Sequence, residues 1–171
     1  MQADVTVNIS YNDHEVKKAV AFWLLRINKI RTLFFVAYPC LILASLCFFL
    51  YGGSIVLAIA CVLIGVLIHC FFYVRPLAGY KEFYGKRKGG TYTFGETRVL
   101  ITGAEIESTV AWTMYKKAYE TPVAFLLLDD NRFVYVFPKS CFNDMTDMDK
   151  LRNLLIRKTA YVNYAGKGAN V

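Results

Sequence analysis

Two histidines are the first residues of this sequence to consider for acid–base chemistry. His14 lies at the start of an amphipathic segment, and we expect it to be exposed to solvent. His69 lies in a long apolar segment, six residues before Arg75. Because an ionisable group in such a segment is a functional candidate, His69 is a possible intramembrane polar site. We prefer a neutral imidazole hydrogen-bonded to Thr32 or Tyr38, since no acidic residue is present nearby to complete a proton relay.

No other residues have the types and spacing of a catalytic or metal site. Asp129 and Asp130 are adjacent carboxylates, but they lie in a predicted hairpin turn, where acidic residues are common turn formers. Asp144, Asp147 and Asp149 begin like a calcium loop, yet the required glycine and final glutamate do not follow. P-loop, dinucleotide-binding and hydrolase motifs are missing as well. We therefore predict no catalytic residue, no metal, no cofactor and a protein that is not an enzyme.

Lys139 is a candidate for binding rather than for catalysis. It lies in the segment Phe-Pro-Lys-Ser-Cys-Phe at 137–142. Pro138 has no N–H group and is expected to end the strand before it. The Lys139 ammonium could contact a lipid headgroup or a carboxylate of a partner protein, so Lys139 is a possible partner contact. The simpler interpretation is a solvated lysine at the end of a strand.

One apolar run dominates the elements that would position these residues. The 43 residues between Arg31 and Arg75 contain no charged side chain. One helix of that length would be about 64 Å long, whereas a bilayer core is about 30 Å thick and needs about 20 residues per span. The run therefore predicts two transmembrane helices, 32–51 and 54–74, with Gly52 and Gly53 at the reversal. A buried hairpin in a soluble core is disfavoured because the run lacks a polar stripe.

Basic residues flank the apolar run on both sides. By the positive-inside rule, this arrangement predicts a multi-pass protein with both termini in the cytoplasm. The same cations are able to contact anionic lipid headgroups, at about 1 kcal/mol per residue near the surface. The domain after the run has no basic face, so we predict no nucleic-acid partner. The possible lipid-headgroup contacts are Lys17, Lys18, Arg26, Lys29, Arg31, Lys81, Lys86, Arg87 and Lys88.

Residues 1–11 have the pattern of a strand. Val5, Val7 and Ile9 alternate with polar residues, which predicts a strand with one buried face. A lone strand has nothing to bury that face against. We therefore expect this N-terminal strand to join the sheet that follows Gly90.

Residues 12–31 are predicted to form an amphipathic juxtamembrane helix, capped by Asn12 or Asp13. Its apolar residues are spaced by three and four positions and lie beside lysines and arginines. The helix either lies along the membrane interface, with Trp23 at headgroup depth, or packs on its own domain. The residues of this apolar stripe are Val16, Val20, Trp23, Ile27 and Ile30.

The pattern changes from helix to strand after a basic juxtamembrane segment, 75–90. Residues 91–164 contain short alternating segments and turn signals, which predict an antiparallel sheet. Asp144 is expected to cap a last helix that closes this sheet. Counting the N-terminal strand, we predict about seven strands before the helix and a flexible tail at 165–171. The predicted apolar face of the helix is Met148, Leu151, Leu154 and Leu155.

Three short motifs in the last domain resemble those of the YcxB-like family. Thr-Tyr-Thr-Phe-Gly-Glu at 91–96 resembles the opening of its cytoplasmic domain. Val-Ala-Trp at 110–112, with the lysine pair at 116–117, and the Phe-Pro-Lys segment at 137–142 are similar to later motifs. The resemblance implies a small bacterial membrane protein whose cytoplasmic domain is pleckstrin-homology-like (PH-like), with no established reaction.

The expected fold is a membrane α+β protein, with a two-span helical hairpin and a cytoplasmic PH-like antiparallel sheet with a C-terminal helix. The expected location is the bacterial cytoplasmic membrane. We expect a membrane-tethered binding module that recognises anionic lipid or an unknown protein partner. One alternative is an immunity or defence protein that neutralises a toxin at the membrane. Another is a small transporter or channel subunit, although the spans offer few polar residues to line a pore.

Overall fold

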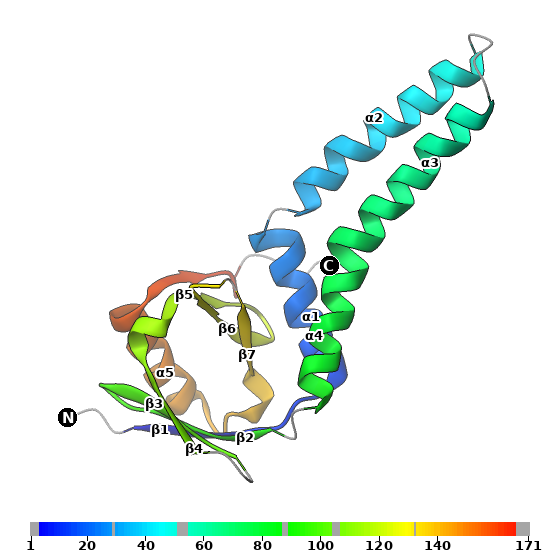
Figure 1. Cartoon of the computed structure of the whole chain (residues 1–171). Helices are drawn as coiled ribbons and strands as arrows, with labels where there is room; N and C mark the ends of the chain where they lie inside the picture. The colour runs from blue at the N-terminus through cyan, green and yellow to red at the C-terminus, as the bar shows by residue number, and fades with distance from the viewer. Residues whose placement is uncertain are drawn as a thin grey trace. The chain divides into compact units, whose positions relative to one another are not determined.

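Figure 1 shows the computed structural model of the chain, which consists of two compact units. Residues 4–28, 30–50, 55–86, 89–103, 107–131 and 133–166 are described by the structure. The hairpin unit contains Ala21–Tyr80, and the sheet unit contains Met1–Val20 together with Lys81–Val171. In the sequence, the hairpin unit is thus inserted between the first strand and the rest of the sheet unit.

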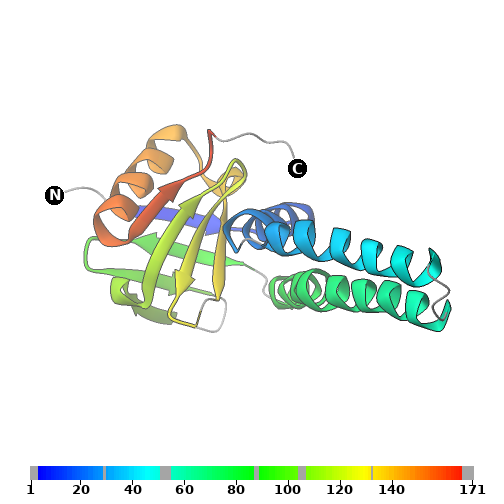
Figure 2. The ribbon, with the colours of Figure 1, turned by 90° about the horizontal axis from the view of Figure 1, so that it is seen from above.

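The hairpin unit is built on two long antiparallel helices, α2 (Ile30–Leu50) and α3 (Ile55–His69), which pack side by side (Figures 1 and 2). Pro39 lies inside α2 without ending it. A π-helical turn, η2 (Cys70–Val74), continues α3 into α4 (Arg75–Lys86). A second one, η1 (Trp23–Ile27), follows α1 (Asp13–Phe22). The predicted reversal at Gly52 and Gly53 lies outside the described residues.

The second long helix continues beyond the predicted span 54–74. Residues Ile55–Lys86 form one helix of 32 residues, so the basic juxtamembrane segment expected at 75–90 is helical up to Lys86. The helix continues because Tyr84 near its end is buried in the sheet unit. Gly89 then redirects the chain into the sheet. Its φ is +86°, and a Cβ there would lie only 2.0 Å from the Ile9 carbonyl oxygen.

Large apolar side chains cover the outside of α2 and α3. Phe35 is 80% exposed, and Phe49 and Leu67 are each 66% exposed. Both helices are long and apolar enough to cross a membrane by length and composition. Core helices of soluble proteins can have such compositions too, but they are mostly buried. In the most apolar part of α2, no residue is buried. In the most apolar part of Ile55–Lys86, only 11% of the residues are buried.

Over the described residues, the sheet unit contains two four-stranded sheets and the helix α5, together with most of α1 and the end of α4. In the first sheet the strand order is β1-β2-β3-β4, and in the second it is β7-β6-β5-β8. The helix α5 (Met145–Lys158) contacts β1 of one sheet and β8 of the other. The strands are β1 (Val5–Ile9), β2 (Gly90–Phe94), β3 (Arg98–Thr102), β4 (Glu107–Ala111), β5 (Tyr115–Glu120), β6 (Ala124–Asp129), β7 (Val134–Pro138) and β8 (Ala160–Asn163).

The N-terminal strand pairs as its alternation predicts. β1 is antiparallel to β2, with Val5 opposite Phe94 and Val7 opposite Tyr92. In this register Val5, Val7 and Ile9 all point into the core, where each is at most 2% exposed. The first strand therefore joins a sheet whose other strands begin only at Gly90, and segments from before and after the hairpin unit are needed for one core.

The sheets enclose an aromatic and aliphatic core. Phe94 and Phe137 lie in different sheets, yet their ring centroids are 5.3 Å apart in an edge-to-face arrangement. Trp112 is buried as well, and its indole N–H donates to the Gly95 carbonyl at 2.8 Å. Trp112 is thus a core residue. Leu151, Leu154 and Leu155 of α5 complete the core, as their spacing predicts.

Two features of the sheet unit differ from the expected single antiparallel sheet. The strands divide into two sheets, and a strand that was not predicted, β8, follows α5 and is parallel to β5. β8 is short and mostly exposed, so it has no apolar alternation to reveal it. It forms because α5 returns the chain to the open edge of β5. The start of α5 agrees with the prediction, since the Asp144 carboxylate accepts the Asp147 N–H at 2.7 Å.

The amphipathic helix packs within the protein. Val16 and Val20 are at most 2% exposed, and Trp23 is 8% exposed, so protein covers the apolar stripe. Within the hairpin unit, the Trp23 ring lies edge-on to Tyr80, with centroids 5.9 Å apart. Trp23 therefore packs against protein, as the second alternative expects, and its place at headgroup depth stays a prediction.

Candidate functional site

The predicted lipid contacts divide between the two units. Lys17, Lys18, Lys81 and Lys86 are exposed in the sheet unit, and Arg26 and Arg31 are exposed in the hairpin unit. Lys29, Arg87 and Lys88 lie outside the described residues.

Two of these lysines have carboxylate neighbours. Lys81 lies 3.2 Å from Asp13, and Lys86 lies 2.5 Å from Glu82 on the same face of α4. Both pairs are well exposed, so each contributes little to stability. They do reduce the local positive charge at the end of α4. In the sheet unit, Lys17 and Lys18 on α1 make no ion pair with another described residue.

Lys139 binds a carboxylate within the chain. Its ammonium lies 2.6 Å from Glu120 Oε1, and only 20% of the lysine side chain is exposed. The interpretation of Lys139 as a solvated lysine is therefore wrong. Pro138 ends β7, and the following 3-10 turn, η4 (Lys139–Cys141), directs Lys139 towards β5. Within the chain, the Lys139 ammonium thus has a carboxylate partner, and its contact with a partner protein stays a prediction.

Glu120, at the end of β5, is the centre of a cluster that was not predicted. It is 1% exposed, and each carboxylate oxygen accepts two hydrogen bonds. Arg152 donates from Nε to Oε2 at 2.7 Å and from Nη2 to Oε1 at 2.9 Å. Lys139 adds a second bond to Oε1, and the Tyr161 hydroxyl donates to Oε2. The cluster joins β5, η4, α5 and β8.

The protonation of Glu120 follows from these contacts. Burial by itself would raise the pKa of the carboxyl, but the hydrogen bonds from Arg152, Lys139 and Tyr161 lower that pKa to about 2. Burial and the bond to Glu120 raise the pKa of the Tyr161 hydroxyl. Glu120 is therefore ionised at neutral pH with all four acceptor positions used. A carboxylate in this state stabilises structure and does not abstract protons.

Sequence reasoning overlooked Glu120 because its partners are far away in the chain. Lys139, Arg152 and Tyr161 follow it by 19, 32 and 41 residues. One signal was present, since Glu120 is an acidic residue between apolar strand residues and Thr-Pro at 121–122. A charge at such a position needs a buried partner.

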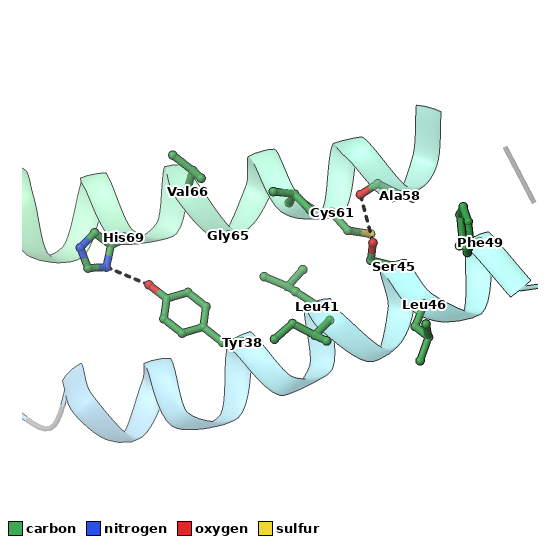
Figure 3. Close-up of a pocket in the computed structure, with 12 residues that line it drawn as sticks. Tyr38, Leu41, Ser45, Leu46, Phe49, Ala58, Cys61, Gly65, Val66 and His69 are labelled. Carbon is green, nitrogen blue, oxygen red and sulfur yellow. Dashed lines mark hydrogen bonds between the residues drawn. The ribbon is translucent and has the colours of Figure 1, made fainter. Parts of the chain in front are cut away.

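His69 makes the hydrogen bond that the sequence suggested, with Tyr38. The Tyr38 hydroxyl lies 2.8 Å from His69 Nδ1, across the interface of α2 and α3 (Figure 3). The rings of Phe34 and Tyr73 lie beside the imidazole, at centroid distances of 5.3 and 5.4 Å. His14 is exposed, as expected. Over the described ranges, no group of three His, Cys, Asp or Glu side chains is placed to hold a metal ion.

The Tyr38–His69 pair lies at one end of a groove between α2 and α3. The groove has a volume of about 710 Å³. Apolar side chains form most of its wall, including Leu41, Leu46 and Phe49 of α2 and Val66 of α3 (Figure 3). Farther along the groove, the Ser45 hydroxyl donates to the Ala58 carbonyl at 3.4 Å.

Comparison with known proteins agrees with the motifs in the sheet unit. Residues 94–155 match the model of a family described as YcxB-like protein, which confirms the resemblance over this segment. The segment extends from the end of β2 into α5 and includes Glu120, Lys139 and Arg152. No curated protein and no solved structure matches the chain.

Proposed function

We propose that this YcxB-like chain is a membrane-tethered binding module of the bacterial cytoplasmic membrane. In this proposal α2 and α3 cross the bilayer, both termini are cytoplasmic, and the sheet unit is a PH-like domain that recognises anionic lipid at the membrane surface. The observation that carries the proposal is the exposed apolar surface of α2 and α3. Side chains such as Phe35 and Leu67 would be costly to leave in water, at about 25 cal/mol per Å².

The lengths of the helices support a crossing. The 21 residues of α2 extend about 31 Å, which matches the hydrocarbon thickness of a bilayer. The 32 residues of Ile55–Lys86 extend about 48 Å, which exceeds that thickness by more than three turns. The excess is α4, which carries Arg75, Lys81 and Lys86. A helix that leaves the bilayer with a basic end has the charge pattern of a cytoplasmic exit.

The contacts of Tyr84 support a direct attachment of the sheet unit to this helix. The Tyr84 hydroxyl donates to the Val134 carbonyl at 2.7 Å and accepts the Val136 N–H at 2.9 Å. These groups belong to β7, the edge strand of the second sheet. Phe83 also packs against Phe133, at a centroid distance of 4.8 Å. The last turns of α4 therefore form part of the sheet unit.

The number of strands and the helix that follows them support the PH-like assignment. In the described part of the chain, seven strands in two sheets precede α5, which agrees with the number of strands expected from the sequence. Lipid recognition is supported by exposed cations on α1 and α4, which flank the apolar helices in the chain. The apolar wall of the groove between α2 and α3 does not favour the transporter alternative, because a path for ions needs polar groups.

Cysteine labelling in cells tests the membrane topology. In a chain whose native cysteines are replaced by alanine, a cysteine at Gly53 should react with an impermeant maleimide added from outside. A cysteine at Lys18 should react only after the cells are opened. Labelling of both positions in intact cells, or of neither position, would contradict the proposed crossing.

Lipid recognition is tested with the full chain, because a fragment that starts at Lys81 lacks β1. The chain is reconstituted in vesicles of phosphatidylglycerol and phosphatidylcholine, and the lipids retained after detergent extraction are counted by native mass spectrometry. Replacement of Lys17, Lys18, Lys81 and Lys86 by Gln should reduce the retained phosphatidylglycerol severalfold at low salt. In the control variant, Lys116 and Lys117 of β5 are replaced by Gln, and the amount of retained phosphatidylglycerol should not change. Equal retention in all variants would contradict lipid recognition by α1 and α4.

A further inference from the structure

We propose that the groove between α2 and α3 holds one acyl chain of an anionic phospholipid, whose headgroup lies between Arg31 and Arg75. This inference rests on the proposed membrane crossing, and it adds a specific lipid site within the hairpin unit. It differs from the surface lysines of the sheet unit, because the site is a hollow at the depth of the hydrocarbon core.

The size and chemistry of the groove fit a lipid chain. Its volume of about 710 Å³ lies within the roughly 300–1,000 Å³ that is usual for small-molecule sites. Small residues on α3 leave the space open, since Ala58, Cys61 and Gly65 all face α2 along it (Figure 3). Only Leu41 approaches closely, 3.4 Å from where a Gly65 Cβ would be. An empty groove in a bilayer would lose dispersion contacts along its whole wall.

Polar groups occur mainly at the end of the groove nearest the basic residues. Tyr38 and His69 form that end, and their hydrogen bond uses Nδ1 of the imidazole. Nε2 has no hydrogen-bond partner among the described residues. An unpaired polar atom in hydrocarbon is costly, so a ligand ester group beside Nε2 would be favourable. A lipid bound with its glycerol ester at this end would place the ester beside Tyr38 and His69 and the acyl chain along the apolar wall of the groove.

Charge determines which amphiphile fits this site. Arg31 precedes Tyr38 by seven residues, and Arg75 follows His69 by six, which corresponds to about 10 Å along each helix. Because α2 and α3 are antiparallel and joined by the Tyr38–His69 bond, both guanidinium groups lie beyond the same end of the groove. Both arginines are exposed, and neither forms an ion pair within the described ranges. Arginine binds phosphate in a bidentate manner, so the pair is suited to a phosphate group.

The test uses the full chain in vesicles and a phosphatidylglycerol with a diazirine on its acyl chain. After illumination, the labelled peptides are mapped by mass spectrometry. Labels should concentrate on groove residues such as Leu41 and Val66. Filling the groove with Cys61→Phe should reduce this labelling at least fivefold. The matched control is Cys47→Phe, an exposed position on α2 outside the groove, and it should leave the labelling unchanged.

The headgroup part of the site is tested with the same reagent. Replacement of both Arg31 and Arg75 by Gln should remove the preference of the groove for the phosphatidylglycerol probe over a matching phosphatidylcholine probe. A preference that persists in this variant would overturn the arginine assignment.

The outcomes separate this inference from the proposed function. Even labelling around α2 and α3, with no effect of Cys61→Phe, would overturn the lipid site and leave the membrane crossing intact. Cross-links between two chains through groove residues would also overturn it, because a second copy would then fill the groove. The absence of label on either helix, together with failed labelling at Gly53, would contradict the crossing itself.

Discussion

Phenylalanine side chains are exposed on the helices α2 and α3 of the hairpin unit and buried in the core of the sheet unit. In the hairpin unit, Phe35 and Phe49 are 80% and 66% exposed. In the sheet unit, Phe94, Phe125 and Phe137 are at most 1% exposed. The position of a phenylalanine in this chain therefore depends on the medium that surrounds its unit, and a phenylalanine is not always a core residue. The sheet unit follows the rule for water, and the hairpin unit has the outward apolar surface expected in lipid.

Polar groups differ between the two units as well. The hairpin unit holds a partly buried hydrogen bond between Tyr38 and His69, with no acidic residue in the apolar run. The sheet unit buries the Glu120 carboxylate beside Lys139 and Arg152. An ionised group is retained only where donors occupy every acceptor position, since the penalty for desolvation is large. The comparison indicates that a buried charge in this chain needs the rigid frame of the two sheets.

The largest expected effect comes from a charge on the inner face of β1. Val7→Asp places a carboxylate in the core of the sheet unit, where Val7 is 2% exposed. The free energy of unfolding should fall by about 5 kcal/mol, comparable with the stability of a small domain. Limited proteolysis in membranes should then degrade the sheet unit while the chain stays membrane-bound. Asn8→Asp adds the same charge on the exposed face and is the control. Equal protease resistance of the two variants would show that β1 does not complete this core.

A charge on the outer face of α2 should impair membrane insertion and leave the sheet unit folded, the opposite of the effects expected for Val7→Asp. Leu43 is 60% exposed, so Leu43→Lys would be harmless to a protein in water. In a bilayer the lysine should raise the free energy of insertion by about 3 kcal/mol and reduce the inserted fraction, with no effect on the folded sheet unit. Resistance to carbonate extraction measures insertion. Leu33→Lys is the control near the end of α2, where the lysine can reach the headgroups. Unimpaired insertion of the Leu43 variant would contradict the lipid environment.

The charged cluster predicts a defined acid sensitivity. The pKa of Glu120 is about 2 in the folded state, against 4.5 for an ordinary glutamate. The unfolded state thus binds more protons between these values, so about 3 kcal/mol of stability is present above pH 4.5 and is lost as the pH falls to 2.

Glu120→Gln should remove this contribution and flatten the dependence of stability on pH below 4.5. Urea unfolding at several pH values, followed by pulse proteolysis, measures both effects. Glu96→Gln is the control, because Glu96 pairs with Arg157 and Lys158 at the exposed surface and should matter little. Identical acid profiles for the native chain and the Glu120 variant would show that the cluster does not control acid unfolding.

The smallest expected effect concerns the junction of α4 and β7. Tyr84→Phe removes a hydroxyl that bonds both the Val134 carbonyl and the Val136 N–H. Stability of the sheet unit should fall by about 1–2 kcal/mol, because two buried backbone groups lose their partner. Hydrogen exchange at Val136 should accelerate. The control is Tyr92→Phe, another buried tyrosine, whose hydroxyl has no hydrogen-bond partner among the described residues. A Tyr84 variant as stable as this control would show that water replaces the bond.

Local patterns in the sequence were sufficient for the elements with one strong periodicity. The charge-free run predicted two long apolar helices, and the alternation of Val5, Val7 and Ile9 predicted a strand that joins the distant sheet. Asp144 was predicted as the cap of α5 from its place before an apolar helical repeat. The Tyr38–His69 bond was one of two options that the sequence left open. These features depend on residues close together in the sequence, or on the requirement that an element with one apolar face bury that face against another element.

Only the tertiary structure determined the features that join distant parts of the chain. β8 has no apolar pattern and forms because α5 returns the chain to β5. The partner of Lys139 is Glu120, 19 residues away, and the pair needs Arg152 and Tyr161 from still later elements. The groove exists because small side chains of α3 face α2, a register that composition does not specify. Periodicity shows which face of an element is buried, whereas the fold decides which residues meet there.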